Sequence, residues 1–166
     1  MTIQDFVGKN NPIGEAIWSK KYQRAGETFD QWLDRVSGGD ADVRRLIAER
    51  KFLFGGRILS NRNLQDEERV TYSNCYVVSP PEDNLESIYQ TCSNLARTYS
   101  YGGGCGIDIS KLAPAGARVR NQAKSTSGAV SFMDTFSQVT HQIGQHGRRG
   151  ALMLSISVKH PDSEAF

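Results

Sequence analysis

The sequence predicts an α/β fold preceded by a small helical segment, and two observations lead to this prediction. From residue 70 onward, the local patterns follow the order strand, helix, strand, loop, helix, loop and strand. Such alternation is typical of α/β folds, in which helices connect the strands of one sheet. Over about the first 65 residues, apolar residues instead recur at helical spacing. We therefore expect a helical segment over residues 1–65 and an α/β part over residues 66–166.

The helical segment contains two helices whose apolar residues share one face. Residues 28–37 begin with Thr28, a favourable N-cap, and residues 41–50 follow a Gly-Gly-Asp turn. The face residues are Phe29, Trp32, Leu33 and Val36 in the first helix, and Val43, Leu46 and Ile47 in the second. The stretch FGGRILSNRN, residues 54–63, is predicted to be a turn and a loop.

The α/β part begins with a predicted strand over residues 70–78, VTYSNCYVV, which is rich in β-branched and aromatic residues. A helix follows, because Asp83 and Glu86 form a D-x-x-E capping box after two prolines. An apolar stripe at helical period then comprises Leu85, Ile88, Cys92, Leu95 and Tyr99. The glycine cluster of SYGGGCGIDIS, residues 100–110, ends this helix.

The remaining elements alternate with two loops that carry positive charge. CGIDIS, residues 105–110, is a short alternating strand, and residues 111–128 form a polar loop of unusual length, a kind that is often functional. A helix over about 129–143 precedes the glycine-rich loop 144–150, and a third strand spans 151–158. The basic residues of the two loops are Lys111, Arg118, Arg120 and Lys124 in the first, and Arg148 and Arg149 in the second. Because arginine binds phosphate through paired hydrogen bonds, the loops suggest a polyphosphate or nucleotide site, although a solvated turn remains the alternative.

The composition excludes several classes of protein. Lys plus Arg is 20 and Asp plus Glu is 18, so the net charge of +2 does not suggest a nucleic-acid partner. No run approaches the roughly 18 apolar residues of a membrane span, and the N-terminus lacks the apolar core of a signal peptide. Three cysteines fit a reducing compartment, so we expect a cytoplasmic protein. No CxxC or HxxxH spacing occurs, so no metal site is predicted.

The local sequence around the cysteines leaves their roles open. Cys92 lies on an apolar helical face, where a small buried thiol is common. Cys105 follows three glycines, where nothing nearby in the sequence supplies a base, and Cys75 lies within a predicted strand. The glycine cluster matches neither the GxGxxG nor the Walker phosphate motif. It is either a tight turn or a place where the backbone approaches a ligand.

Several stretches, taken in order and at their spacings, resemble one family. They are NPIGEAIWSKKY, KFLFGGRILSNR, SNCYVV, SYGGGCGIDISKL, SGAVSFMD, IGQHGRRGA and HPDSEAF. Together they are similar to the N-terminal part of a ribonucleotide reductase large chain, with the best match to the adenosylcobalamin-dependent class II type. The resemblance implies a helical segment followed by a ten-stranded α/β barrel. Because this chain supplies only the first strands, and stops directly after a strand-like stretch, we expect an incomplete barrel.

The resemblance implies a chemistry and a set of site residues. In this family, cobalt–carbon homolysis in adenosylcobalamin generates a thiyl radical on one cysteine, which abstracts the ribose 3′-hydrogen. Two further cysteines then supply two electrons and become a disulfide, and Cys75 matches the first of this pair. Ser73, Asn74 and Gly104 match positions that line the substrate site. Cys105 is expected to be a packing residue.

The resemblance also implies partners. Asp83 matches a residue that contacts a deoxynucleoside triphosphate or ATP effector at a dimer interface, and its role as a helix cap is an equally good account. Residues 111–128 and 144–150, the latter with Arg148 and Arg149, match two loops that relay the effector's identity to the substrate. The expected partners are a ribonucleoside di- or triphosphate, a second copy of the chain, the remainder of the reductase chain and a thioredoxin-type reductant.

The thiyl-radical cysteine and the second reducing cysteine of the family match no residue of this sequence. The chain alone is therefore expected not to reduce nucleotides. One alternative is a non-catalytic module of the same family that binds a nucleotide effector or dimerises. Another is a fragment of a class I large chain, which differs in its radical cofactor.

Overall fold

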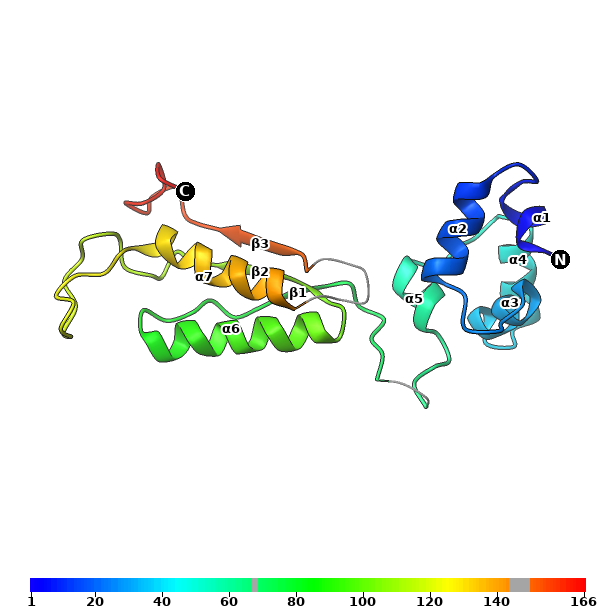
Figure 1. The fold of residues 1–166 in the computed structure, drawn as a ribbon, viewed down its shortest axis with the longest axis horizontal. Helices are drawn as coiled ribbons and strands as arrows, with labels where there is room; N and C mark the ends of the chain where they lie inside the picture. The colour runs from blue at the N-terminus through cyan, green and yellow to red at the C-terminus, as the bar shows by residue number, and fades with distance from the viewer. Residues whose placement is uncertain (67–68, 144–149) are drawn as a thin grey trace. The chain divides into compact units, whose positions relative to one another are not determined.

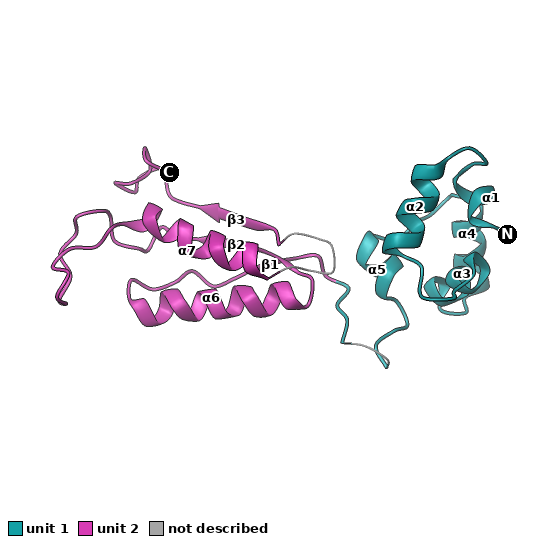
Figure 2. Ribbon diagram, in the orientation of Figure 1, with its two compact units in different colours: residues 1–72 teal, residues 73–166 magenta. Residues whose placement is uncertain are grey.

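The computed structural model describes residues 1–66, 69–143 and 150–166 and divides the chain into two compact units. Unit 1 comprises Met1–Tyr72 and unit 2 comprises Ser73–Phe166 (Figure 2). The boundary that the sequence suggested, between residues 65 and 66, lies within unit 1. No helix in the described part of the chain combines the length and the apolar character needed to cross a membrane.

Unit 1 is helical, as the sequence predicts. Its helices are α1 (Ile3–Val7), α2 (Pro12–Lys21), α3 (Phe29–Ser37), α4 (Ala41–Ala48) and α5 (Gly56–Asn61) (Figure 1). Thr28 caps α3 as predicted, since its side chain accepts a hydrogen bond from the Gln31 amide in a capping box. The prediction of a loop over residues 54–63 is wrong, because α5 forms there. Leu59 is buried in the core of unit 1, and this tertiary contact outweighs the poor helix propensity of the glycines before it.

One ion pair ties the helices of unit 1 together. The Arg35 guanidinium lies 2.7 Å from the Glu27 carboxylate, and both side chains are largely buried. The same guanidinium donates to the backbone carbonyl oxygens of Tyr22, Ser60 and Arg62. It therefore links the end of α2 to α3 and α5, and its donors are satisfied where an unpaired charge would be costly.

Unit 2 is a three-stranded parallel sheet with two crossover helices. The strands β1 (Cys75–Val77), β2 (Gly104–Asp108) and β3 (Leu152–Ser155) lie in the order β1-β2-β3. Helix α6 (Leu85–Ser100) connects β1 to β2, and α7 (Ala129–Gln142) lies between β2 and β3 in the chain (Figure 1). The predicted α/β order is confirmed.

The outer strands are shorter than the sequence predicts. The expected strand 70–78 reduces to Cys75–Val77, and the carbonyl oxygen of Thr71 accepts a hydrogen bond from the Asn61 side chain. The expected strand 151–158 reduces to Leu152–Ser155, since the Ser157 amide bonds to the Ser110 hydroxyl. Side chains therefore form hydrogen bonds with backbone groups that would pair with a neighbouring strand if these strands were longer.

Helix α6 begins one residue later than the predicted capping box requires. Asn84 is the N-cap, and its side chain accepts a hydrogen bond from the Ser87 amide at 2.8 Å. The capping role expected for Asp83 is thus wrong, because its carboxylate accepts from the Ala113 amide instead. The predicted stripe is buried at Ile88, Cys92, Leu95 and Tyr99, whereas Leu85 is exposed.

Both helices cover the same face of the sheet. The alternate β2 residues Cys105 and Ile107 are buried with Leu95 of α6 and Phe136 of α7 in one core cluster. Because successive residues of a strand point to opposite faces, the intervening residues face away from the helices. This second face, the open face, comprises Cys75, Val77, Gly104, Gly106, Asp108, Met153 and Ser155. Val77 is 93% exposed and Met153 is 74% exposed, so the described residues leave these two side chains of the face open to solvent.

The three glycines before Cys105 serve different purposes. Gly102 has a φ of 84°, which ends the turn after α6 in a conformation that favours glycine. A Cβ on Gly103 would lie 2.6 Å from the Tyr76 ring and 2.8 Å from the Thr98 methyl group. Gly104 pairs with Cys75 in the sheet and belongs to the open face.

The substitution Gly103→Ala is predicted to destabilise unit 2. The added methyl group overlaps an aromatic ring and a helix side chain, and such overpacking costs about 1–3 kcal/mol. Chemical denaturation followed by circular dichroism measures the loss. Gly106→Ala is the matched control, since its Cβ would meet nothing within 4 Å. Equal stability of the two variants would contradict the assignment.

Candidate functional site

Cys75 is the exposed thiol of the chain, and it lies on the open face. It pairs with Gly104 in the parallel register of β1 and β2, and the Gly104 amide donates to the Asn74 carbonyl oxygen at 2.7 Å. Ser73 and Asn74 are the two residues before Cys75 in the chain, and both are exposed. The structure therefore brings Cys75, Asn74 and Gly104 together at one point of the sheet. Their roles toward a substrate stay a prediction.

The other two cysteines are buried on the helix side of the sheet. Burial raises the pKa of the Cys92 thiol and of the Cys105 thiol above the ordinary value. Cys105 also contacts the Thr98 and Tyr99 side chains, and the Tyr99 hydroxyl is hydrogen-bonded to Thr140 of α7. Since the thiolate is the nucleophile, both residues are poor reagents at neutral pH. Cys105 is placed as a packing residue, as the sequence analysis expects.

A polar cluster that the sequence analysis missed lies where β2 and β3 end. The Asp108 carboxylate accepts from the Ser110 amide at 2.8 Å and from the Ser155 hydroxyl at 3.2 Å. Hydrogen bonds from Ser110, and then from Ser155, hold the pKa of Asp108 below its usual value. Ligands of parallel sheets bind at the carboxyl ends of the strands, so the position of Asp108 in the alternation was an available signal.

The long loop 111–128, called the basic loop here, is ordered as a narrow hairpin. Arg118 pairs with Ser125 in an antiparallel bridge, and backbone bonds join Gly116 to Thr126 and Val119 to Lys124. Lys111 at its start forms an ion pair with Glu82. The exposed cations farther along the hairpin are Arg118, Arg120 and Lys124.

Two of the predicted effector residues fall outside the described residues, whereas the structure shows the contacts of the third. Arg148 and Arg149 lie in the segment 144–149, which the structure does not describe. Asp83 lies just before α6, and its carboxylate holds the Ala113 amide at the base of the basic loop. Its contact with an effector stays a prediction.

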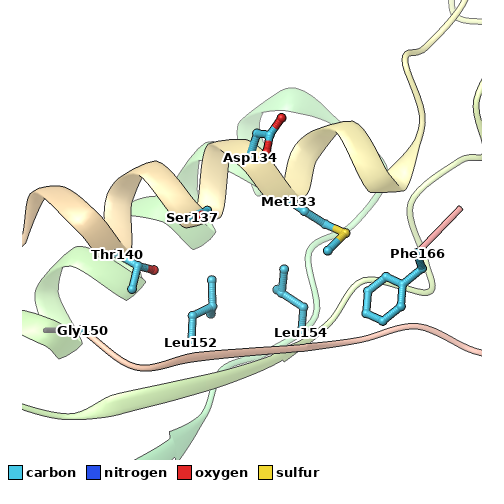
Figure 3. A pocket seen from close by; sticks show the side chains of 8 residues that line it. All are labelled: Met133, Asp134, Ser137, Thr140, Gly150, Leu152, Leu154 and Phe166. Carbon is cyan, nitrogen blue, oxygen red and sulfur yellow. The ribbon is translucent and has the colours of Figure 1, made fainter.

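A groove of about 510 Å³ lies between α7 and β3 on the helix side of the sheet (Figure 3). Met133, Leu152, Leu154 and Phe166 give it an apolar lining, and Asp134, Ser137 and Thr140 line it from α7. Leu152 pairs with the buried Cys105, so the groove and Cys75 lie on opposite faces. The groove therefore does not belong to the site of the exposed thiol.

Metal ligands do not cluster in this part of the fold. Within residues 1–66, 69–143 and 150–166, no three His, Cys, Asp or Glu side chains are grouped so that they could hold a metal ion. The chemistry that the described side chains offer is that of a thiol on an open sheet face, with a carboxylate and hydroxyl groups at its edge.

Parallel strands joined by crossover helices on one side define unit 2 as a segment of an α/β protein. A family model described as the barrel domain of ribonucleotide reductase matches residues 73–166. The chain belongs to the ribonucleotide reductase family. It is similar in fold to the class Id ribonucleotide reductase alpha subunit of Actinobacillus ureae, with a TM-score of 0.75 at 20% identity over 95% of this chain and 30% of that one.

Relatives with reductase names match most of the chain. The vitamin B12-dependent ribonucleoside-diphosphate reductase of Thermoplasma acidophilum is 40% identical over 98% of this chain and 22% of its own length. The protein of that name from Mycobacterium tuberculosis is 40% identical over 53% of this chain and 13% of its own length. The ribonucleoside-diphosphate reductase subunit alpha of Synechocystis is 30% identical over 72% of this chain and 15% of its own length. The chain thus spans about a fifth or less of these relatives, and its likeness to the vitamin B12-dependent type confirms the resemblance.

The three thiols are predicted to differ sharply in reactivity. In the folded chain, Cys75 should react with iodoacetamide at pH 8 about tenfold or more faster than Cys92 and Cys105, because it is exposed and they are buried. Raising the pH should accelerate the two buried thiols later in the titration, since burial raises the pKa of each. Peptide mass spectrometry over time measures each site. Denatured protein, in which all three thiols react alike, is the control, and faster labelling of Cys105 in the folded chain would contradict the placement.

Proposed function

We propose that this chain supplies the helical segment and the first strands of the barrel of a ribonucleotide reductase, with Cys75 as one of the two cysteines that reduce the substrate. The observation that carries the proposal is the position of Cys75 on the open face, opposite Gly104. Gly104 itself is buried, and a Cβ there would lie 3.3 Å from the Ala151 side chain, so the glycine lets the backbone pack closely beside the exposed thiol. The proposed location is the cytoplasm.

The proposed reaction uses the strand to hold the thiol. Two cysteine thiols together give up two electrons and two protons and form a disulfide, while the ribose loses its 2′-hydroxyl as water and gains hydrogen there. Such chemistry needs the thiol fixed against one face of the ribose, and the backbone pairing of β1 with β2 provides that rigidity. The radical cysteine and the second reducing cysteine must come from outside this sequence.

Adenosylcobalamin is supported for the family by the vitamin B12-dependent relatives. The described residues do not fit it as a ligand of this chain alone. The open face carries small and mostly apolar side chains, and three strands form no barrel that could enclose a corrin ring.

The same proposal includes a site for a nucleotide effector at a dimer interface. The exposed cations of the basic loop, Arg118, Arg120 and Lys124, provide the charge that a nucleoside triphosphate needs. Arg148 and Arg149 are proposed to join them, and Asp83 is proposed to contact the effector from the start of α6. The substrate is proposed to be a ribonucleoside di- or triphosphate, and the reductant a thioredoxin-type protein.

A second candidate is a non-catalytic module that binds the effector and dimerises. Leu85 and Tyr89 lie one turn apart on α6 and are 52% and 59% exposed. Apolar side chains that share an exposed helix face are suited to pack against a second copy. Titration of dATP and dGTP against the chain, with sedimentation to detect dimers, tests this candidate. A Leu85→Ser, Tyr89→Ser variant should stay monomeric if the candidate is right.

The substitution Cys75→Ala is predicted to abolish turnover with dithiol reductants in the polypeptide that carries this sequence and the remaining catalytic cysteines. The matched variant Cys105→Ala should retain turnover and lose about 1 kcal/mol of stability, because it removes one small buried group. Deoxynucleotide formation from a labelled ribonucleotide is the measurement. Full activity of Cys75→Ala would refute the assignment of the reducing pair.

The 166-residue chain alone is predicted to form no deoxynucleotide. It lacks the partner thiol that the two-electron step requires, because Cys92 and Cys105 are buried on the opposite side of the sheet from Cys75. The assay combines the chain with adenosylcobalamin, dithiothreitol and a ribonucleoside triphosphate. Product above the level of a denatured control would show that the chain is catalytically complete.

A further inference from the structure

One carboxylate holds both ends of the basic loop. Asp162 follows β3, and its two carboxylate oxygens each lie 3.1 Å from the Ala115 amide nitrogen. One of these oxygens also accepts from the Ala129 amide at 3.1 Å. Ala115 lies where the hairpin begins, and Ala129 is the first residue of α7, so a single side chain closes the neck of the loop.

The helix that follows the loop depends on this carboxylate for its cap. Gly128 is the N-cap of α7 and supplies no side-chain hydrogen bond. Asp162 provides the bond from a distance of 33 residues along the chain. A negative charge at this position also interacts favourably with the helix dipole. The fit is close, since a Cβ on Gly128 would lie 2.6 Å from the Ala115 nitrogen and 2.7 Å from the Asp162 carboxylate.

His160 links the segment that carries Asp162 to the start of the basic loop. Its Nδ1 accepts from the Asp162 amide at 3.0 Å, and its Nε2 donates to the Leu112 carbonyl oxygen at 2.8 Å. The ring is buried, so these two bonds set its tautomer and orientation. The segment after β3 and the start of the basic loop are therefore one hydrogen-bonded body.

The same body continues to the edge of the open face. The His160 amide donates to the Ser157 carbonyl oxygen, and the Ser157 amide donates to the Ser110 hydroxyl at 2.7 Å. The Ser110 amide in turn donates to Asp108. An unbroken series of hydrogen bonds thus runs from the loop neck to the carboxylate on the open face.

We propose that Asp162 is the positioning residue that ties the neck of the basic loop to the carboxyl edge of the sheet, so that the loop and the open face keep a fixed relation. The consequence for regulation rests on the proposed function, in which a nucleotide effector acts through the basic loop. A ligand that shifts the loop then also shifts Asp108 and its neighbours, which share the face of Cys75. Asp162 touches neither ligand and acts through the backbone groups that it holds.

The test compares Asp162→Asn with Asp83→Asn by amide hydrogen exchange in the folded, ¹⁵N-labelled chain. In asparagine an NH2 group replaces one carboxylate oxygen and meets amides that are themselves donors, and the negative charge is lost, so exchange at Ala129 should rise about tenfold or more. The proposal also requires a rise of about threefold or more at Ser157, which Asp162 does not contact. Asp83→Asn is the matched control, because one oxygen of Asp83 accepts from a single amide, that of Ala113, and an asparagine keeps such an oxygen. It should remove a carboxylate charge at the neck and leave exchange at both Ala113 and Ser157 unchanged.

A second pair of variants keeps the proposal testable if Asp162→Asn does not fold. Gly128→Ala should force the carboxylate from the neck and raise exchange at Ser157 in the same way. Gly116→Ala is its control, because Gly116 has a similar positive φ but open space around its Cβ. A rise at Ala129 with no change at Ser157, in either Asp162→Asn or Gly128→Ala, overturns the proposal and leaves Asp162 as a local helix cap.

Adding dATP separates this proposal from the proposed function. In the unmodified chain, binding should shift the amide resonances of both the basic loop and Asp108, and Asp162→Asn should keep the first shift and lose the second. If the shift of the Asp108 amide resonance persists in Asp162→Asn, the proposed link between the loop neck and the sheet edge is overturned. Absence of any binding to the unmodified chain refutes the effector role alone, because the exchange results need no ligand.

Discussion

The one-sided covering of a parallel sheet is the constraint on which the rest of unit 2 depends. Parallel strands can be joined only by crossover connections, and here both connections place their helices against the same face. The residues of β2 therefore divide strictly by alternation. Cys105 and Ile107 complete the core, whereas Gly104, Gly106 and Asp108 face away from it. The exposure of Cys75 follows from the same division, since its partner in the ladder is Gly104 and not Cys105.

This division explains why the most conspicuous thiol of the sequence is not the reactive one. Cys105 stands in a glycine cluster, but backbone conformation and close packing account for these glycines. Gly102 adopts a left-handed conformation, and Gly103 lies under the Tyr76 ring. Burial then raises the pKa of Cys105 and removes it from solvent. Cys75 has no such surroundings, and its position on the open face alone makes it available.

The sequence predicts the elements of unit 2 well because their periodicities are strong. The stripe from Ile88 to Tyr99 and the α/β alternation both follow from burial of one face. Element ends are predicted less well, because competing side chains decide them. Asn84 and Asp83 are adjacent and both suit a cap, and only the tertiary contact of Asp83 with Ala113 separates them. The sequence does not predict helix α5, because the burial of Leu59 depends on the other helices. This burial outweighs the low helix propensity of the glycines at its start.

The candidate site shows the same limit more sharply. Cys75, Asn74 and Gly104 could be selected through family resemblance, and the strand register then places them together. Asp162 could not be selected, because nothing in HPDSEAF shows that a carboxylate there accepts from amides 47 and 33 residues earlier. Such a contact has no local period and no spacing rule. It exists because the chain after β3 returns to the neck of the basic loop, where two backbone amides would otherwise lack partners. The polar groups that close a loop are thus set by topology, and they become visible only when the fold is known.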